Sequence, residues 1–251
     1  MPIDHIFPSP TVKTVAYEVK FPNLFYLESK IGDLQLKLIE QFPESSVFLR
    51  RQIMIGDSTA PEMQNQNIED NTVIKVWQFK SPMNYLVNIQ SNSIVISSEF
   101  HKTYNLGTEN KFRDVIIQVV DAFLELTKIP SFTRVGLRYV DECPIAEKNN
   151  ESFLSYYNSA LALNRFNIAD ATEMGSRTVV KKDNSFLIYA EMLQQVSENE
   201  WKLILDFDGF QEKVNTADYL AVTDNLHDLV SAEFETSIKE PVIQLMEQEH
   251  N

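Results

Sequence analysis

Two arginines and two aspartates are the residues of this sequence whose types and spacing best suit chemistry. Arg134 and Arg138 lie in the run 131–141, where apolar and polar residues alternate as in a β-strand. Side chains an even number of positions apart share one face of a strand, so both guanidinium groups point the same way, with Gly136 between them. Each guanidinium suits a carboxylate or a phosphate, and Gly136 would let a ligand or another backbone approach closely. An anion site is one hypothesis for this strand.

Ion pairing is the competing interpretation, and the one we favour. Asp206 and Asp208 lie in and directly after a second predicted strand, 201–207, and also share one face. If the two strands are neighbours in the fold, these carboxylates neutralise Arg134 and Arg138 and leave no anion site. All four residues are therefore candidates for ligand binding or for ion pairing.

A divalent metal site is a weaker alternative for the same two aspartates. Carboxylates two residues apart lie roughly 6–7 Å along one strand face and could bind a hard cation such as Mg²⁺. Further oxygen ligands would have to come from Glu99, Asp141 or Glu142, and no fixed spacing connects these with Asp206 and Asp208. The sequence therefore assigns no metal site beyond this alternative.

The sequence lacks the motifs of common enzyme classes. It has no GxSxG, GxGxxG or GxxxxGK[ST] segment. The four histidines form no HxH or HExxH spacing, and we expect each at the surface or at a helix cap; they are His5, His101, His227 and His250. The single cysteine, Cys143, cannot form an internal disulfide, which favours a reducing compartment. We predict no catalytic residue and no cofactor.

The charge of the chain limits its partners. The 251 residues carry a formal charge of −14, of which −11 falls in residues 129–251. A negative surface repels a phosphate backbone, so nucleic-acid binding is disfavoured and a basic protein partner is favoured. The alternative is that the charge only keeps the protein soluble. With no apolar run near the roughly 20 residues of a membrane span and no targeting segment at Met1, we expect a cytoplasmic protein away from membranes.

Hydrophobic periodicity predicts an α+β fold in two halves. The first half has strands at 12–21, 47–55, 72–80, 85–90 and 94–100, with helices at 27–42 and 111–128. The second has strands at 131–141, 172–180, 185–193 and 201–207, with helices at 152–163 and 216–239. The polar loop 56–71 is either a lid or partner contact or a disordered segment, and the tail 240–251 either docks or frays.

The two halves follow a similar order of elements. Val15-Ala16-Tyr17-Glu18-Val19 aligns with Val135-Gly136-Leu137-Arg138-Tyr139, and a helix soon follows each. This predicts two tandem β-α-β-β-β-α units, 1–128 and 129–251, in one compact globule with antiparallel sheets, helices on one face and a pseudo-twofold axis. A groove between the units is the default ligand site, because such junctions favour pockets.

Three stretches together resemble a known group of proteins. They are the lead into Glu18-Val19-Lys20-Phe21, the strand Arg134-Val-Gly-Leu-Arg-Tyr-Val-Asp141, and Leu203-Ile-Leu-Asp-Phe-Asp208 followed by a long helix with Leu226-His227. They resemble an uncharacterised prokaryotic family of single-chain proteins of about this length, sporadically distributed among bacteria and archaea. That distribution implies mobile accessory genes, including defence or toxin-control modules. The resemblance implies no catalytic residues.

Three functional hypotheses follow from the sequence. We favour a non-catalytic binding protein that acts with a partner protein, in a prokaryotic defence or toxin-control system. A second is a metal-assisted hydrolase or nuclease that uses Asp206 and Asp208, with Arg134 and Arg138 holding an anionic substrate. The third is a sensor of an anionic small molecule that binds between the two units.

Overall fold

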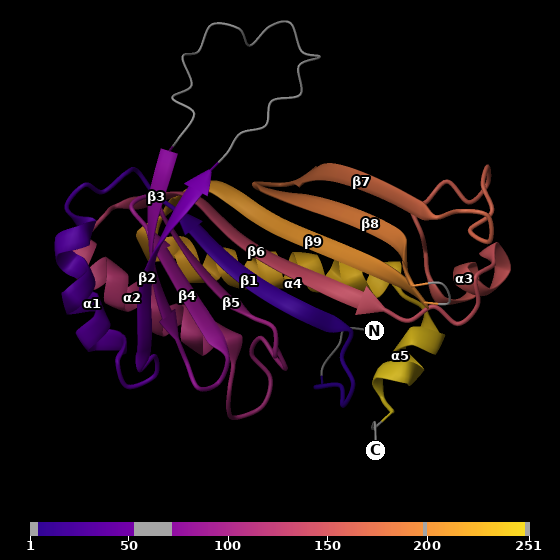
Figure 1. Cartoon of the computed structure of the whole chain (residues 1–251), viewed down its shortest axis with the longest axis horizontal. Helices are drawn as coiled ribbons and strands as arrows, with labels where there is room; N and C mark the ends of the chain where they lie inside the picture. The colour runs from indigo at the N-terminus through magenta and orange to yellow at the C-terminus, as the bar shows by residue number, and fades with distance from the viewer. Residues whose placement is uncertain (1–4, 53–71, 198–199, 249–251) are drawn as a thin grey trace, which may run out of the picture.

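A computed structural model describes residues 5–52, 72–197 and 200–248, which form a mixed α+β fold around one large sheet (Figure 1). The nine strands are β1 (Val12–Lys20), β2 (Glu44–Gln52), β3 (Thr72–Lys80), β4 (Tyr85–Gln90), β5 (Ser93–Ser98), β6 (Ser131–Cys143), β7 (Glu173–Lys182), β8 (Ser185–Ser197) and β9 (Glu200–Asn215). Their order in the sheet is β2-β3-β4-β5-β1-β6-β9-β8-β7, and every neighbouring pair is antiparallel. The α+β class is thus confirmed, and the strands of both halves belong to one continuous sheet.

The middle of the sheet is the pairing of β1 with β6. Val15, Tyr17 and Val19 alternate along β1 and are completely buried, as the period of two predicts. Glu18 lies opposite Gly136 on the other face, and Ala16 lies opposite Arg138. The register therefore brings the acidic position of β1 beside the arginine strand.

The helices that form the core lie on one face of the sheet. α1 (Ile31–Leu38) packs on α2 (Phe112–Thr127), while α4 (Tyr219–Ser237) packs on β6 and β9. The Tyr219 hydroxyl donates a hydrogen bond to Asp121 of α2, which ties α4 to α2. Figure 1 shows α2 and α4 behind the strands, and none of the described helices covers the front face.

Close packing of α4 on β9 depends on Gly209. A Cβ atom built at this residue would lie 3.2 Å from Cγ2 of Val230 and 3.5 Å from Cδ2 of Leu226. Leu226 and Val230 belong to α4, and both are buried. The missing side chain at Gly209 therefore lets the helix approach the sheet, which positions the α4 residues described below.

Two predicted segments differ from the structure, and for a third the sequence allows two alternatives. The helix expected at 152–163 is only α3 (Asn150–Tyr156), because Tyr157 takes an extended conformation and pairs with Ile238. The strand expected at 201–207 extends to Asn215, since it pairs along β6 and β8 at the same time. The tail docks as α5 (Glu240–Met246), whose Val242 and Met246 are buried.

Two further expectations concern the loop and the membrane. The loop 56–71 lies outside the described residues. Among the helices of the described ranges, none is both long and apolar enough to cross a membrane.

Candidate functional site

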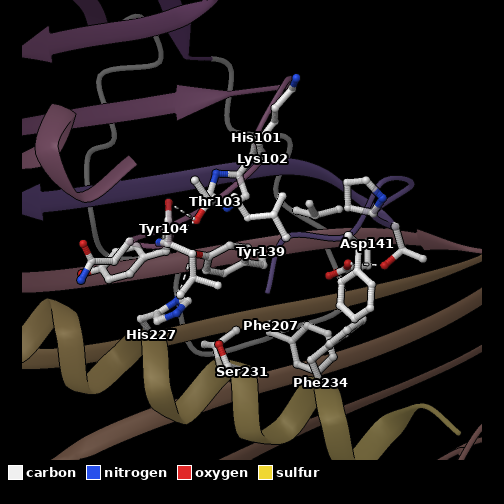
Figure 2. Close-up of a pocket in the computed structure, with 18 of the residues that line it drawn as sticks. His101, Lys102, Thr103, Tyr104, Tyr139, Asp141, Phe207, His227, Ser231 and Phe234 are labelled. Carbon is white, nitrogen blue, oxygen red and sulfur yellow. Dashed lines mark hydrogen bonds between the residues drawn. The ribbon is translucent and has the colours of Figure 1, made fainter. Parts of the chain in front are cut away.

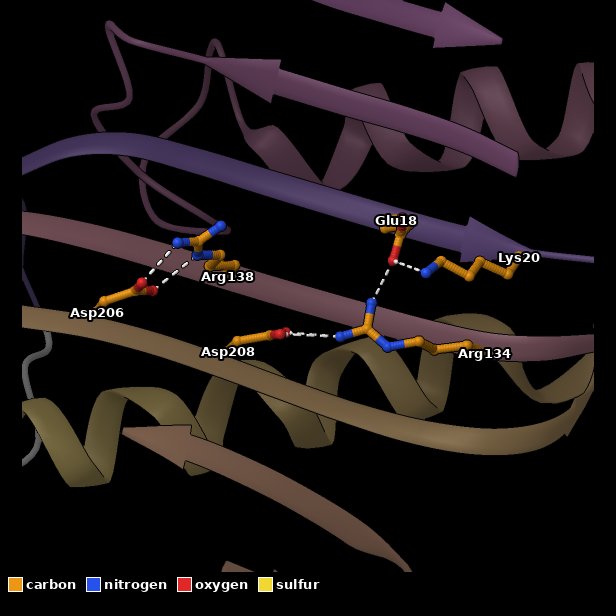
Figure 3. A network of polar contacts seen from close by, with 6 residues as sticks. All are labelled: Glu18, Lys20, Arg134, Arg138, Asp206 and Asp208. Carbon is orange, nitrogen blue, oxygen red and sulfur yellow. Dashed lines mark hydrogen bonds and ion pairs between the residues drawn. The ribbon is translucent and has the colours of Figure 1, made fainter. Parts of the chain in front are cut away.

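The four residues singled out from the sequence lie together on the sheet face that faces away from α4. Nη2 of Arg134 donates to both carboxylate oxygens of Asp208, each at 2.9 Å, and its Nη1 donates to Glu18 of β1 (Figure 3). The side chains of these three residues are 20–26% exposed. Arg134 is thus neutralised from both neighbouring strands.

Arg138 forms the second pair of this network. Its Nε donates to Oδ1 of Asp206 at 2.7 Å and its Nη2 to Oδ2 at 2.5 Å, which is a bidentate pair. That hydrogen bonding raises the pKa of Arg138 further above its usual range. Its side chain is 52% exposed, so water screens this pair more than the first.

Gly136 serves Arg134 rather than an outside ligand. A Cβ atom at Gly136 would lie 2.6 Å from Nη1 of Arg134, so the guanidinium lies across the glycine. The guanidinium carbon of Arg134, Cζ, lies 4.6 Å from the centre of the Phe210 ring, as in a cation–π contact. The close approach that the glycine permits is therefore an internal one.

The two aspartates are engaged by the arginines. Burial raises the pKa of Asp208, against the opposing effect of Arg134 beside it. Within the described ranges, no group of three or more His, Cys, Asp or Glu side chains could hold a metal ion. We call Glu18, Arg134, Arg138, Asp206 and Asp208 the ion-pair network.

A cavity of about 380 Å³ lies on the opposite side of the sheet, the helix side (Figure 2). Its wall combines residues within 5–12 and 101–106 of the first half with residues of β6, β9, α4 and α5 of the second. Much of the wall is apolar or aromatic, including Phe7, Tyr104, Tyr139, Phe207, Phe234 and Met246. Concave, mostly apolar cavities with a few polar groups are the usual form of small-molecule sites.

Asp141 is the buried acidic residue of this cavity. Alternation along β6 places it on the helix face with Leu137 and Tyr139, and only 5% of the residue is exposed. The Thr11 hydroxyl donates a hydrogen bond of 2.8 Å to its Oδ1. Burial raises the pKa of Asp141 to about 7, although the bond from Thr11 opposes the shift.

Two histidines form another part of the wall. Nδ1 of His227 lies 3.2 Å from the Tyr139 hydroxyl, and its ring stacks on Tyr104 with the ring centres 4.0 Å apart. His101 meets Tyr139 edge to face at 5.4 Å, and only 8% of His101 is exposed. Burial lowers the pKa of His101 to about 4 and also lowers the pKa of His227. Both rings are therefore neutral at pH 7.

The expectation that every histidine lies at the surface or at a helix cap is wrong for His101, which is buried, and for His227, which is half-buried in the middle of α4. His101 is packed against Phe112 and Tyr139, and His227 is mostly covered by aromatic rings. His5 is exposed and hydrogen-bonds Glu247 at 2.6 Å, while His250 lies outside the described residues. The spacing of the histidines in the sequence carried no indication that two of them meet.

Asp224 is a second acidic residue of the cavity wall, and its carboxylate is already hydrogen-bonded. Nε and Nη2 of Arg113 donate to its two oxygens at 2.8 and 2.9 Å, and the Tyr104 hydroxyl donates at 2.7 Å. The hydrogen bonds from Arg113 are the main reason that the pKa of Asp224 lies below its usual range. Asp224 is therefore a structural carboxylate that holds the wall together.

A second hollow of about 750 Å³ lies at the other end of the helix layer. It is lined only by first-half residues from 40–41, 81–85 and 110–118. The charged residues among them, Glu40, Lys111 and Asp114, are exposed or half-exposed. No acidic or basic side chain is buried in that hollow among the described residues, so the 380 Å³ cavity is the better candidate site.

No model of a protein family matches the chain, and no curated protein sequence matches it significantly.

Proposed function

We propose that the protein is a non-catalytic binding protein whose cavity on the helix side of the sheet holds a small, mostly apolar molecule. The observation that carries this proposal is a 380 Å³ cavity, walled by both halves of the chain, with the buried carboxyl of Asp141 inside it. Such a volume corresponds to roughly a dozen water molecules at ~30 Å³ each. A few polar groups in an apolar wall provide orientation and specificity.

The chemistry of the wall favours binding over catalysis. Asp141 could exchange a proton near neutral pH, and its hydrogen-bond partner is the Thr11 hydroxyl. Among the described residues no histidine is hydrogen-bonded to Asp141 or Thr11, so the hydroxyl lacks the adjacent base of an activated hydroxyl–histidine pair. The His227 ring is held by Tyr139 and Tyr104. The metal-dependent alternative loses support because Asp206 and Asp208 are each paired with an arginine.

We further propose that the halves 1–128 and 129–251 are two copies of one unit, related by a pseudo-twofold axis between β1 and β6. The strand order supports it: outward from β1 come β5, β4, β3 and β2, and outward from β6 come β9, β8 and β7. In each half the first strand is innermost and the last strand lies next to it. The cavity would then lie at the junction between the copies.

The wider role stays a prediction. A partner protein, a place in a defence or toxin-control system, and a cytoplasmic location rest on the charge of the chain and on its resemblance to a sporadically distributed family. The net charge of −14 supports a basic partner.

A cavity-filling variant tests the binding function. Ser231 lines the cavity from α4, whereas its neighbour Ala232 is exposed. We expect small aromatic molecules such as indole to stabilise the wild type, by about 2.7 kcal/mol at about 100 times the dissociation constant. Ser231→Phe should lose this stabilisation, and the matched control Ala232→Phe should keep it. The measurement is thermal unfolding at increasing concentrations; equal stabilisation of both variants, or none of the wild type, contradicts the proposal.

A further inference from the structure

The charged groups at the cavity wall differ in whether they have a partner. Asp224 is bound by Arg113, and His5 is hydrogen-bonded to Glu247. Lys102 is exposed, and in Figure 2 its side chain extends away from the other labelled residues. Asp228 is also exposed. Asp141 is different. It is an acidic residue of the cavity wall that is buried, and no cationic group of the described residues lies within ion-pair distance of it.

An unpaired carboxyl in this position is costly to ionise. A carboxylate taken out of water is stabilised by a cation and by hydrogen bonds, and the Thr11 hydroxyl supplies a single bond to one oxygen. The two wall histidines do not supply the missing charge, because burial keeps the pKa of His101 at about 4 and lowers that of His227. The counter-charge must therefore come from outside the described chain, or the carboxyl must stay protonated.

Aromatic rings surround the same space. Phe7, Tyr104, Tyr139, Phe207 and Phe234 all line the cavity. Ring faces attract cations, and Tyr and Phe are common in sites that bind organic ammonium groups. The rings also provide the apolar surface for the body of a ligand.

Resting on the binding function proposed above, we propose that the ligand is a small organic amine, with its ammonium group on Asp141 and its apolar body among the aromatic rings. The ammonium group donates to the carboxylate and supplies the charge that the chain lacks there. An anionic ligand is disfavoured, because the two arginines suited to an anion lie in the ion-pair network on the other face of the sheet. The acidity of the second half, −11 of the −14, also favours entry of a cation.

Three probes with one ring and similar chain length test this assignment. They are 2-phenylethylamine, 2-phenylethanol and 3-phenylpropionate, which are positive, neutral and negative at pH 7. Their affinities for the wild-type protein are measured by calorimetry and by thermal shift. We expect the amine to bind about tenfold tighter than the alcohol or better, and the carboxylate to bind weakest.

Two variants separate the Asp141 contact from general electrostatics. Asp141→Asn removes one charge and keeps an oxygen that can accept from Thr11. In this variant the amine and the alcohol should therefore bind with about equal affinity. Asp228→Asn removes the same charge from an exposed residue at the wall, and the preference for the amine should remain. Nuclear magnetic resonance spectra of both variants show whether the fold is kept.

Each outcome decides between the two proposals. Equal binding of the alcohol and the amine overturns the amine assignment and keeps the binding function. Loss of the preference in Asp228→Asn as well as in Asp141→Asn also overturns it, because the attraction is then a general one. Failure of all three probes to bind contradicts both proposals.

Discussion

Arg138 and Asp141 are three residues apart on β6 and have opposite electrostatic surroundings. Arg138 belongs to the ion-pair network, where the described acidic and basic side chains pair across strands on an uncovered face. Asp141 points to the helix side into an apolar cavity, with a hydroxyl as its bonded neighbour. A conspicuous cluster of charges can therefore be complete in itself, while a lone buried carboxyl still lacks its partner.

We expect the strongest effect from Asp141, which makes the stability of the fold depend on pH. The unfolded chain loses this proton near the ordinary pKa of 3.8, and the folded chain holds it to about pH 7. The folded state therefore binds more protons between these values, so its stability contribution is full below about pH 4 and is lost as the pH rises through 7. At 1.36 kcal/mol per pKa unit the loss is on the order of 4 kcal/mol.

Asp141→Asn isolates this contribution from other titrating groups. The cavity wall also carries other titratable side chains, namely His5, His101, Lys102, Tyr104, Tyr139, Asp224, His227 and Asp228. Urea unfolding of wild type and variant at several pH values gives the difference in free energy of unfolding. We expect the free energy of unfolding of the variant to rise relative to that of the wild type as the pH rises from 4 to 8. A constant difference would show that Asp141 titrates normally.

Breaking the ion-pair network should have the next largest effect. Arg134→Ala leaves Asp208 without its bonded cation, while Glu18 keeps only the more exposed Lys20, whose Nζ lies 3.6 Å from its Oε2. The side chains of Glu18, Arg134 and Asp208 are all about three-quarters or more buried. Because an uncompensated buried charge costs several kcal/mol, less where water reaches it, we expect a destabilisation of about 3 kcal/mol. Urea unfolding at pH 7 measures it. A loss no larger than that of an exposed ion pair, under about 1 kcal/mol, would contradict this expectation.

A smaller effect is expected from Gly136→Ala, since the new Cβ meets the end of the flexible Arg134 side chain. Displacing that guanidinium should cost about 1 kcal/mol of stability. In an Arg134→Ala background the same substitution should be neutral or slightly stabilising, because Ala reduces the freedom of the unfolded chain. A double-mutant cycle measures this coupling; additive effects would contradict the internal role of the glycine.

Arg138→Ala should have the smallest effect. The arginine side chain is 52% exposed, so water can solvate Asp206 once the guanidinium is removed. We expect a loss under about 1 kcal/mol, as for exposed pairs, and a smaller loss at high salt. An effect as large as that of Arg134→Ala would mean that the two pairs act as one unit.

Local alternation accounts for much of what could be predicted. The period of two placed Arg134 and Arg138 on one face of their strand, and the same rule placed Val15, Tyr17 and Val19 in the core. It also marked Asp206 and Asp208 as a pair with a common face. An aspartate in the apolar phase of a strand was the one indication, in hindsight, of the buried carboxyl.

Distant contacts decided the rest. Thr11 and Asp141 are 130 residues apart and Tyr139 and His227 are 88 apart, and no spacing rule joins them. A residue's own neighbours in sequence determine which face of an element it occupies. Which strand lies beside which, and which helix covers that face, depends on pairing and packing over the whole chain. That is why the ion-pair candidates were visible in the sequence and a groove between the halves could be expected, whereas the residues that line the cavity were identified only in the folded chain.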